Sequence, residues 1–583
     1  MTGFRIERLK FDALEVQAWS EADPRHSNWP VVYTLDDTKD LYVGETLNGV
    51  GRMYQHLQNK DKQHLRRVHM VLDATFNKSA CLDLESFLIR MFAGDGKFRI
   101  LNRNDGIVDA DYYSREFYRD KFNEIFEELR REGYFTRSIP EIENSDLFKL
   151  SPFKALTQDQ AIAVEDILDG LFTDLGTRAQ STSVVQGEPG TGKTILAIYI
   201  VKLLSDIRTR RDVDAPEGDS IFSEFFVPEN REMLRDFRLG LVIPQQSLRA
   251  SIQAVFRRIP GLEPDMVLTP FQVGEATKPF DLLIVDEAHR LSQRAAQAMG
   301  TLTKQYSEIN SNLFPNGTGL ESQLDWIREL SRHQILLVDP DQAVRPADLP
   351  RETLMTLRRD ALNHHRWYRL HSQMRVKAGS DYVGWIKEIL RGETPQPPDF
   401  GDYDLRFFDD FDAMHDAIMQ REREHGLSRL LAGYAWNWRS RKDRSQFDIE
   451  LGSHRMRWNS RLKDWVNSKD SLDEVGSIHT IQGYDLNYAG VIIGRDLVFD
   501  PTLGRTAFNR ERYFDARGRA NNNFLNRKYS DDDLLVYVRN IYSVLMTRGI
   551  LGTYVYIEDE QLRAQVSRVI GGSLRLIDGS NSI

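Results

Sequence analysis

The sequence has little cysteine, no long apolar run and no excess of positive charge. Its single cysteine, Cys81, excludes an internal disulfide and any cysteine-rich zinc site, so packing alone must hold the fold. No apolar run approaches the roughly 20 residues that span a bilayer, and residues 1–10 lack the apolar core of a signal peptide. We therefore expect a cytoplasmic protein without a membrane anchor.

The formal net charge of -10 argues against a protein that coats nucleic acid nonspecifically, although a local basic groove is compatible with an acidic remainder. A length of 583 residues exceeds a single core and favours three or four domains. With 41% hydrophobic and 28% charged residues, the composition is that of a soluble globular chain.

The most specific local pattern is a glycine-rich loop. Gly187, Gly190 and Gly192 precede Lys193 and Thr194, with an apolar run on each side that reads as a strand before and a helix after. In this context backbone N–H groups turn inward around phosphate oxygens, the lysine reaches the β- and γ-phosphates, and the threonine holds Mg²⁺. The pattern predicts nucleoside triphosphate binding, with ATP and one Mg²⁺ as cofactors.

A second pattern supports this reading. An apolar strand, residues 280–285, ends in Asp286 and Glu287. At this separation from a glycine-rich loop, the first carboxylate is expected to hold Mg²⁺ through water and the second to accept a proton from the attacking water.

The N-terminal region contains two short β-rich runs, residues 29–35 and 40–46, around a turn-prone tetrapeptide, which predicts a hairpin. A helical segment follows, with Arg52 and His56 one turn apart on the same face. A further helical segment, residues 82–89, contains Glu85.

This order resembles the GIY-YIG nuclease domain, with Val31-Val32-Tyr33 as the first motif and Tyr42-Val43-Gly44 as the second. The resemblance implies a compact αβ domain in which Tyr33, Tyr42 and His56 position or deprotonate a water. It further implies that Arg52 stabilises the pentacovalent phosphate and Glu85 holds a second Mg²⁺.

Two departures from the nuclease pattern are present. Val31 stands where the first motif has glycine, and the asparagine that usually follows the acidic helix is displaced. Arg99 occupies the nearest aligned position, and Asn102 or Asn104 can substitute; we select Asn102. A domain that has decayed into a binding module is therefore an open alternative.

Further motifs resemble those of superfamily 1 helicases. Gln160 matches the glutamine that reads adenine in superfamily 1 and 2 helicases, and residues 239–248 resemble motif Ia or, equally well, a plain strand and turn. Gln342 matches a γ-phosphate sensor, and Arg375 and Arg548 match two arginine fingers. Gln482, Gly483 and Asp485 match motif V at the cleft.

The residues of these motifs resemble those of a prokaryotic family that is related to the helicase-like domain of Schlafen proteins. Some members of that prokaryotic family carry an N-terminal GIY-YIG domain. The expected fold is α/β, a small αβ nuclease-like domain followed by two RecA-like doubly wound parallel-sheet domains. The expected ranges are 1–105 for the nuclease-like domain, 106–150 for a helical connector, 151–360 for the first RecA-like domain and 361–583 for the second.

In such a protein, closure of the second RecA-like domain on bound ATP couples hydrolysis to motion along nucleic acid. The predicted function is an ATP-dependent nucleic-acid motor fused to a Mg²⁺-dependent endonuclease, with DNA favoured over RNA and a role in defence. The alternative is a nucleotide-dependent regulatory switch without unwinding. Tryptophans among basic residues between 431 and 465 suit base stacking or, more simply, the core of the second RecA-like domain.

Overall fold

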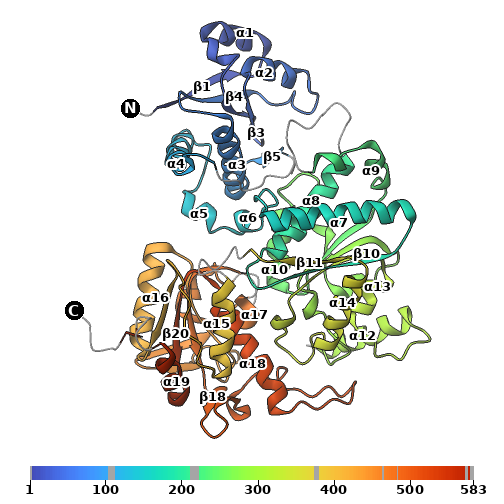
Figure 1. The fold of residues 1–583 in the computed structure, drawn as a ribbon, viewed down its shortest axis with the longest axis vertical. Coiled ribbons are helices and arrows are strands. Elements are labelled where there is room, and N and C mark those ends of the chain that lie inside the picture. The colour runs from blue at the N-terminus through green and yellow to red at the C-terminus, as the bar shows by residue number, and fades with distance from the viewer. Residues whose placement is uncertain are drawn as a thin grey trace. The chain divides into compact units, whose positions relative to one another are not determined.

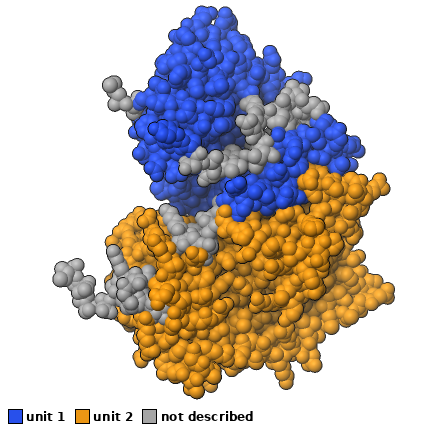
Figure 2. Space-filling view, viewed as in Figure 1, with its two compact units in different colours: residues 1–168, 198–236, 251–266 blue, residues 169–197, 237–250, 267–583 orange. Residues whose placement is uncertain are grey.

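The computed structural model describes residues 3–102, 112–209, 222–297, 299–372, 380–461, 465–481, 484–570 and 576–577. Two compact units are present (Figure 2). The first contains residues 1–168, 198–236 and 251–266, and the second contains residues 169–197, 237–250 and 267–583.

The N-terminal part of the first unit is a five-stranded sheet in the order β1-β4-β2-β3-β5. Its strands are antiparallel except for β3 and β5, which run parallel. The strands are β1 (Phe4–Lys10), β2 (Val31–Asp36), β3 (Asp40–Thr46), β4 (Arg67–Asp73) and β5 (Arg99–Ile100). The predicted hairpin is confirmed as β2 and β3, with Tyr33 opposite Gly44 in the register.

Helices cover both faces of this sheet (Figure 1). Tyr33 and Leu35, which alternate onto one face of β2, share an apolar core with Trp19 of α1 and Met53 of α2. Helix α3 contacts β2 and β3 from the other side. The helices are α1 (Ala13–Ala22), α2 (Gly49–Gln58), α3 (Lys78–Asp95), α4 (Arg115–Arg131), α5 (Ile139–Glu143) and α6 (Asp146–Lys149).

The first sheet of the second unit is six-stranded and entirely parallel, in the order β11-β6-β10-β9-β7-β8. Two of its central strands contain apolar runs, residues 282–285 and 335–338, as expected where helices bury both faces of a parallel sheet. The strands are β6 (Ser181–Gly187), β7 (Leu239–Val242), β8 (Val267–Leu268), β9 (Phe280–Val285), β10 (Ser331–Val338) and β11 (Trp367–Leu370).

The second sheet of this unit has eight strands in the order β14-β15-β16-β13-β17-β20-β12-β21, parallel except for the pair β14 and β15. A separate hairpin is formed by β18 and β19. The strands are β12 (Asp404–Phe408), β13 (Ser428–Ala432), β14 (Ile449–Leu451), β15 (His454–Trp458), β16 (Glu474–Ser477), β17 (Leu486–Ile493), β18 (Leu497–Asp500), β19 (Arg505–Phe508), β20 (Gly549–Ile557) and β21 (Leu576–Ile577).

Helix α16 packs on β13 and β17, and α15 packs on α18, so that helices lie on both sides of the eight-stranded sheet (Figure 1). The remaining helices are α7 (Gln158–Thr177), α8 (Lys193–Thr209), α9 (Pro228–Met233), α10 (Gln246–Phe256), α11 (Pro270–Gly274), α12 (Gly300–Leu313), α13 (Gln323–Glu329), α14 (Arg351–Asn363), α15 (Ser380–Arg391), α16 (Phe411–His425), α17 (Ile478–Ile481), α18 (Asp531–Met546) and α19 (Glu560–Ile570).

The predicted fold class is confirmed: a small αβ domain precedes two sheets built mainly of parallel strands, as in RecA-like domains. Strand β11, which follows residue 360, pairs with β6 and so belongs to the first parallel sheet. The predicted domain boundaries stay predictions. Trp458 and Trp465 are fully buried in the core around the eight-stranded sheet, which favours packing over base stacking for these two side chains. Within the described ranges, no helix is both long and apolar enough to cross a bilayer.

Candidate functional site

The glycine-rich loop joins β6 to α8. Gly190 and Gly192 have φ values of 89° and 76°, a left-handed conformation that favours glycine. At Gly187 a Cβ atom would lie 2.3 Å from the Thr191 hydroxyl. Lys193 is buried and its ammonium donates to the carbonyls of Gly187 at 2.6 Å and Glu188 at 3.1 Å. The loop thus wraps around a cationic centre.

The end of β9 meets the start of α8. Thr194 Oγ1 donates to Asp286 Oδ2 at 2.7 Å, which joins the two residues predicted to hold Mg²⁺. Burial and the neighbouring Glu287 raise the pKa of Asp286. Burial alone would also raise the pKa of Glu287, but the nearby His289, Lys193 and Arg290 hold it below its usual range. The two adjacent carboxyl groups are therefore differentiated, with Glu287 the more readily ionised.

His289 links this pair to the next strand. Its Nδ1 accepts the Asp339 N–H at 3.1 Å, and its other ring nitrogen, Nε2, lies 3.1 Å from Glu287 Oε2. Gln342 Nε2 donates to Asp339 Oδ2 at 2.7 Å. Glu287, His289, Asp339 and Gln342 therefore form one chain of polar contacts along the edge of the parallel sheet. His289 is absent from the predicted site residues, although it stands two positions after Glu287.

The other predicted motor residues are less closely gathered. Arg375, Gln482 and Gly483 lie outside the described residues. Arg548 is buried between α18 and β20, where its Nε donates to the Val544 carbonyl at 3.2 Å and its Nη1 to the Tyr484 carbonyl at 3.4 Å. Asp485 is half-buried directly before β17. In the first unit, Gln160 of α7 accepts the Thr157 N–H at 3.0 Å.

The N-terminal domain gathers its predicted residues around the phenol oxygen of Tyr33. His56 Nε2 lies 2.7 Å from Tyr33 Oη, and Arg52 Nε donates to the same oxygen at 3.2 Å. The Tyr42 ring is 6.3 Å from the Tyr33 ring and 5.3 Å from the His56 ring. A Cβ atom at Gly44 would lie 2.3 Å from Tyr33 Oη, so the phenol occupies space that a glycine leaves open.

Lys62, which the motif comparison did not reveal, orients His56. Its Nζ lies 3.1 Å from His56 Nδ1 and 3.3 Å from the centre of the Tyr42 ring. Because an ammonium only donates, Nδ1 accepts and the imidazole proton is on Nε2, which donates to Tyr33 Oη. Burial, reinforced by Lys62 and Arg52, lowers the pKa of His56 to about 2. Burial also raises the pKa of Tyr33.

Glu85 and Asn102 take different positions around this cluster. Glu85 is half-buried on α3, and its charge acts on Tyr33, so it lies within electrostatic reach of the phenol. Asn102 is buried and bonded to the Val43 backbone at both ends of its amide, accepting from N–H at 3.0 Å and donating to C=O at 2.8 Å. Its side chain extends the ladder of β3 beyond β5. The structure therefore gathers Tyr33, Tyr42, Arg52, His56 and Glu85, and directs Asn102 to the backbone of β3.

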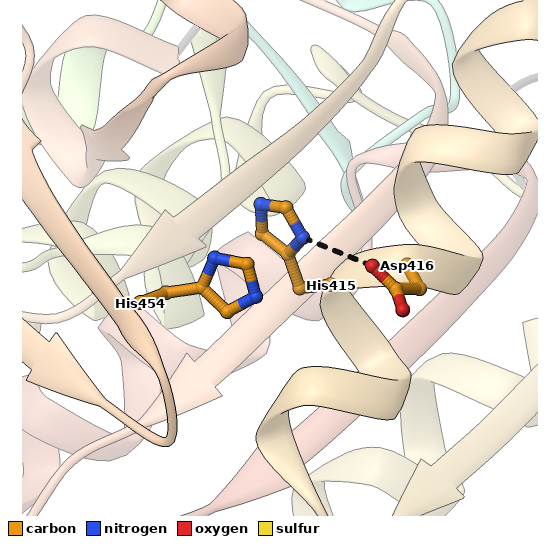
Figure 3. A group of neighbouring side chains, drawn as sticks. All are labelled: His415, Asp416 and His454. Carbon is orange, nitrogen blue, oxygen red and sulfur yellow. Dashed lines mark ion pairs between the residues drawn. The ribbon is translucent and has the colours of Figure 1, made fainter.

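A third group of side chains has residue types that can bind metals, His415 and Asp416 on α16 and His454 on β15 (Figure 3). The two imidazole rings are stacked, with centroids 3.8 Å apart and planes inclined by 26°. Stacked rings direct their in-plane lone pairs side by side and not toward a common point, and the Asp416 side chain is 84% exposed. This group is a packing contact in its present geometry.

Two sheets built mainly of parallel strands, a glycine-rich loop and an acidic strand end at β9 are the arrangement typical of helicase-like, nucleotide-dependent ATPases. The chain belongs to the family described as Schlafen group 3, DNA/RNA helicase domain, whose profile matches residues 180–559. A helicase-like domain implies ATP use, typically with Mg²⁺, and nucleic-acid binding. The chain is also similar to Uncharacterized protein YPL245W of Saccharomyces cerevisiae, with 28% identity over 414 residues that cover 66% of this chain and 83% of the relative.

Proposed function

We propose that this protein is an ATP-dependent nucleic-acid motor joined to a Mg²⁺-dependent phosphodiesterase of the GIY-YIG type. DNA is favoured over RNA as the polymer, and defence against foreign nucleic acid is the proposed role. The observation that carries the nuclease assignment is the convergence of Arg52 and His56 on the phenol oxygen of Tyr33.

In the motor, Lys193 binds the β- and γ-phosphates, and Thr194 and Asp286 would hold Mg²⁺, which offsets phosphate charge when bound. Glu287 accepts the proton of the attacking water, and its low pKa keeps the carboxylate ionised and so free to accept. Gln342 contacts the γ-phosphate, Gln160 the adenine, and Arg375 and Arg548 complete the charge stabilisation on closure. The proposed cleft residues of motif V are Gln482, Gly483 and Asp485.

In the nuclease, Arg52 binds the scissile phosphate, because its guanidinium is held at the phenol cluster. Glu85 would hold Mg²⁺, which supplies Lewis-acid stabilisation of the phosphate when bound. The donors on Tyr33 Oη, Arg52 Nε and the neutral His56 Nε2, favour its phenolate and oppose the rise in pKa that burial causes. Tyr33 and Tyr42 then orient the water or remove its proton, while Asn102 holds the β3 backbone that carries Tyr42.

A second candidate is a nucleotide-dependent switch whose N-terminal domain binds nucleic acid without cutting it. The observation that favours it is the burial of Tyr33: its side chain is 0% exposed, whereas Tyr42, Arg52 and Glu85 around it are half-buried. Val31 at the glycine position of the first motif agrees with this alternative.

One experiment separates the candidates. The full chain and its Glu85→Ala and Glu287→Gln variants are incubated with ATP, Mg²⁺ and a panel of single- and double-stranded DNA and RNA. We expect Glu85→Ala to lose cleavage with unchanged ATPase, and Glu287→Gln to lose ATPase. Cleavage retained by Glu85→Ala would refute the nuclease site. Stimulated ATPase without strand displacement or cleavage in the wild-type protein would establish the switch.

A further inference from the structure

Arg290 is a buried cation whose Nε and Nη2 atoms have no hydrogen-bond partner among the residues that the structure describes. It is the last residue of the short 3-10 turn Ala288–Arg290 that follows Asp286 and Glu287, and it is 5% exposed. Burying an unpaired charged donor costs several kcal/mol, as a rule, unless a partner arrives. The cost is reflected in the pKa of this guanidinium, which burial lowers to about 10.

The carboxylates near Arg290 are already engaged. Asp348 Oδ1 accepts from Arg345 Nη2 at 3.0 Å and from Arg345 Nε at 3.3 Å. Its Oδ2 accepts the N–H groups of Val344 and Arg345 at 3.0 and 3.1 Å. Glu287 faces His289 at 3.1 Å. Both carboxylates attract Arg290 electrostatically, but neither supplies the missing bonds.

The remaining neighbours increase the positive potential. Arg345 opposes the charge of Arg290, and burial together with Arg345 and Arg290 lowers the pKa of His479. Asp515 Oδ2 lies 3.7 Å from His479 Nε2 and acts on the pKa of that ring in the opposite direction to the two arginines. An anion with several acceptor oxygens is therefore the chemically complementary occupant at Arg290.

We propose that Arg290 binds the γ-phosphate of ATP, as a cation supplied by the same parallel sheet as Lys193. This inference rests on the proposed ATP site. Strands β6, β10 and β9 are neighbours in that sheet, so the glycine-rich loop, Asp339 and the turn that ends in Arg290 all leave from one edge. The γ-phosphate is the group that distinguishes ATP from ADP. By binding it, Arg290 would give the site a higher affinity for ATP than for ADP.

The test is nucleotide discrimination by the full-length Arg290→Met variant, a change that keeps much of the volume and removes the charge. Fluorescent β,γ-imido ATP and fluorescent ADP are titrated with Mg²⁺ present. We expect Arg290→Met to lower the affinity for the ATP analogue about 10- to 100-fold, which corresponds to the loss of one charged hydrogen bond. The affinity for ADP should stay within about twofold of the wild-type value. Arg290→Lys, which keeps the charge without the planar fork, should show a smaller loss.

Arg294→Met is the matched control, because Arg294 is equally buried and also has one unpartnered nitrogen, Nη1, among the described residues. Unlike Arg290, it donates from Nη2 to Ser307 at 2.8 Å and lies against the rings of Tyr306 and Phe524. It should leave the ATP-to-ADP affinity ratio unchanged and lower the melting temperature. Without nucleotide, Arg290→Met should melt at or above the wild-type temperature, since it removes an unsatisfied charge. If Arg290→Met does not fold, Arg290→Lys and Arg290→Gln are measured in its place by the same criterion.

An unchanged ratio, or equal loss of both nucleotides, would overturn the inference while the ATPase assignment stands. An unchanged ratio together with weaker oligonucleotide binding would assign Arg290 to a backbone phosphate instead. Failure of the wild-type protein to bind either nucleotide would refute the proposed function itself.

Discussion

The glycine-rich loop and the phenol cluster of the N-terminal domain are built in opposite ways. Residues 187–194 are contiguous, and their conformation follows from two left-handed glycines and a helix start. The phenol cluster draws on β2, β3, α2, α3 and the turn that contains Lys62. The loop is defined locally, whereas the cluster exists only when the domain is folded. Substitutions should therefore act on chemistry alone in the first region and on chemistry and stability together in the second.

The largest effect is expected at the loop. Lys193→Ala removes the cation at the centre of the glycine-rich loop and should reduce ATP hydrolysis by about 10³-fold, because phosphoryl transfer depends on charge stabilisation. Steady-state ATPase measures this. Lys304→Ala, at a side chain that is 80% exposed, is the control and should leave the ATPase rate unchanged. Loss of ATP-independent cleavage in Lys193→Ala would show that the two regions are not independent.

Arg52→Ala should come next, with nucleic-acid cleavage reduced by about 10²- to 10³-fold through loss of a donor to the scissile phosphate. ATPase in the same sample should be unchanged. Arg119→Ala, an exposed arginine of α4, is the matched control. Equal cleavage by Arg52→Ala and wild-type protein would favour the binding-module alternative.

Gly44→Ala tests whether the cluster depends on packing. The added Cβ atom would lie 2.3 Å from Tyr33 Oη, so the phenol or the hairpin must shift. We expect about 1–3 kcal/mol of destabilisation in calorimetric unfolding, together with reduced cleavage. Gly384→Ala is the control: its Cβ atom meets open space in the middle of α15, so it should not destabilise the fold and should stabilise it by up to about 1 kcal/mol, because alanine is the better helix former. Wild-type stability in Gly44→Ala would contradict the close packing around Tyr33.

His56→Gln should have the smallest effect, visible in the pH dependence of stability. Folded His56 has a pKa of about 2 against an ordinary value of 6.5, so below pH 6.5 the unfolded state binds a proton that the folded state does not. Stability is therefore lost as the pH falls from 6.5, by up to about 1.4 kcal/mol per pH unit.

The glutamine variant removes this contribution. As the pH is lowered from about 6.5 to about 5, the wild-type protein should lose more unfolding free energy than His56→Gln does, as measured by calorimetry. Parallel stability curves for the two proteins over this range would mean that His56 titrates normally in the folded state.

Much of the fold follows from the sequence by simple physical rules. The hairpin of β2 and β3 is recognisable from its β-rich runs and turn, and β9 from an apolar run that ends in Asp286 and Glu287. The assignment of β11 to the first parallel sheet was not predictable, because the pattern of the four residues 367–370 does not indicate which strand they pair with. Its pairing with β6 is a long-range choice made by the sheet as a whole.

The candidate sites divide in the same way. The resemblance to the GIY-YIG pattern predicted Tyr33, Arg52, His56 and Glu85 as a set. Spacing could not reveal Lys62, because its contact with His56 depends on how the chain turns after α2. Nor could it reveal that Asn102 is engaged at both ends of its amide by Val43, since that depends on the parallel pairing of β3 and β5.

By itself, the sequence of this protein determined the glycine-rich loop, the acidic strand end and the α/β class, because these depend on local conformation and on hydrophobic periodicity. Only the tertiary structure decided which charges are satisfied. Asp348 accepts hydrogen bonds from Arg345, and His289 faces Glu287. Arg290 is buried, and two of its nitrogens have no partner within the described part of the chain. Burial and pairing arise from residues distant in the chain, and they set both the pKa values and the binding potential of each site.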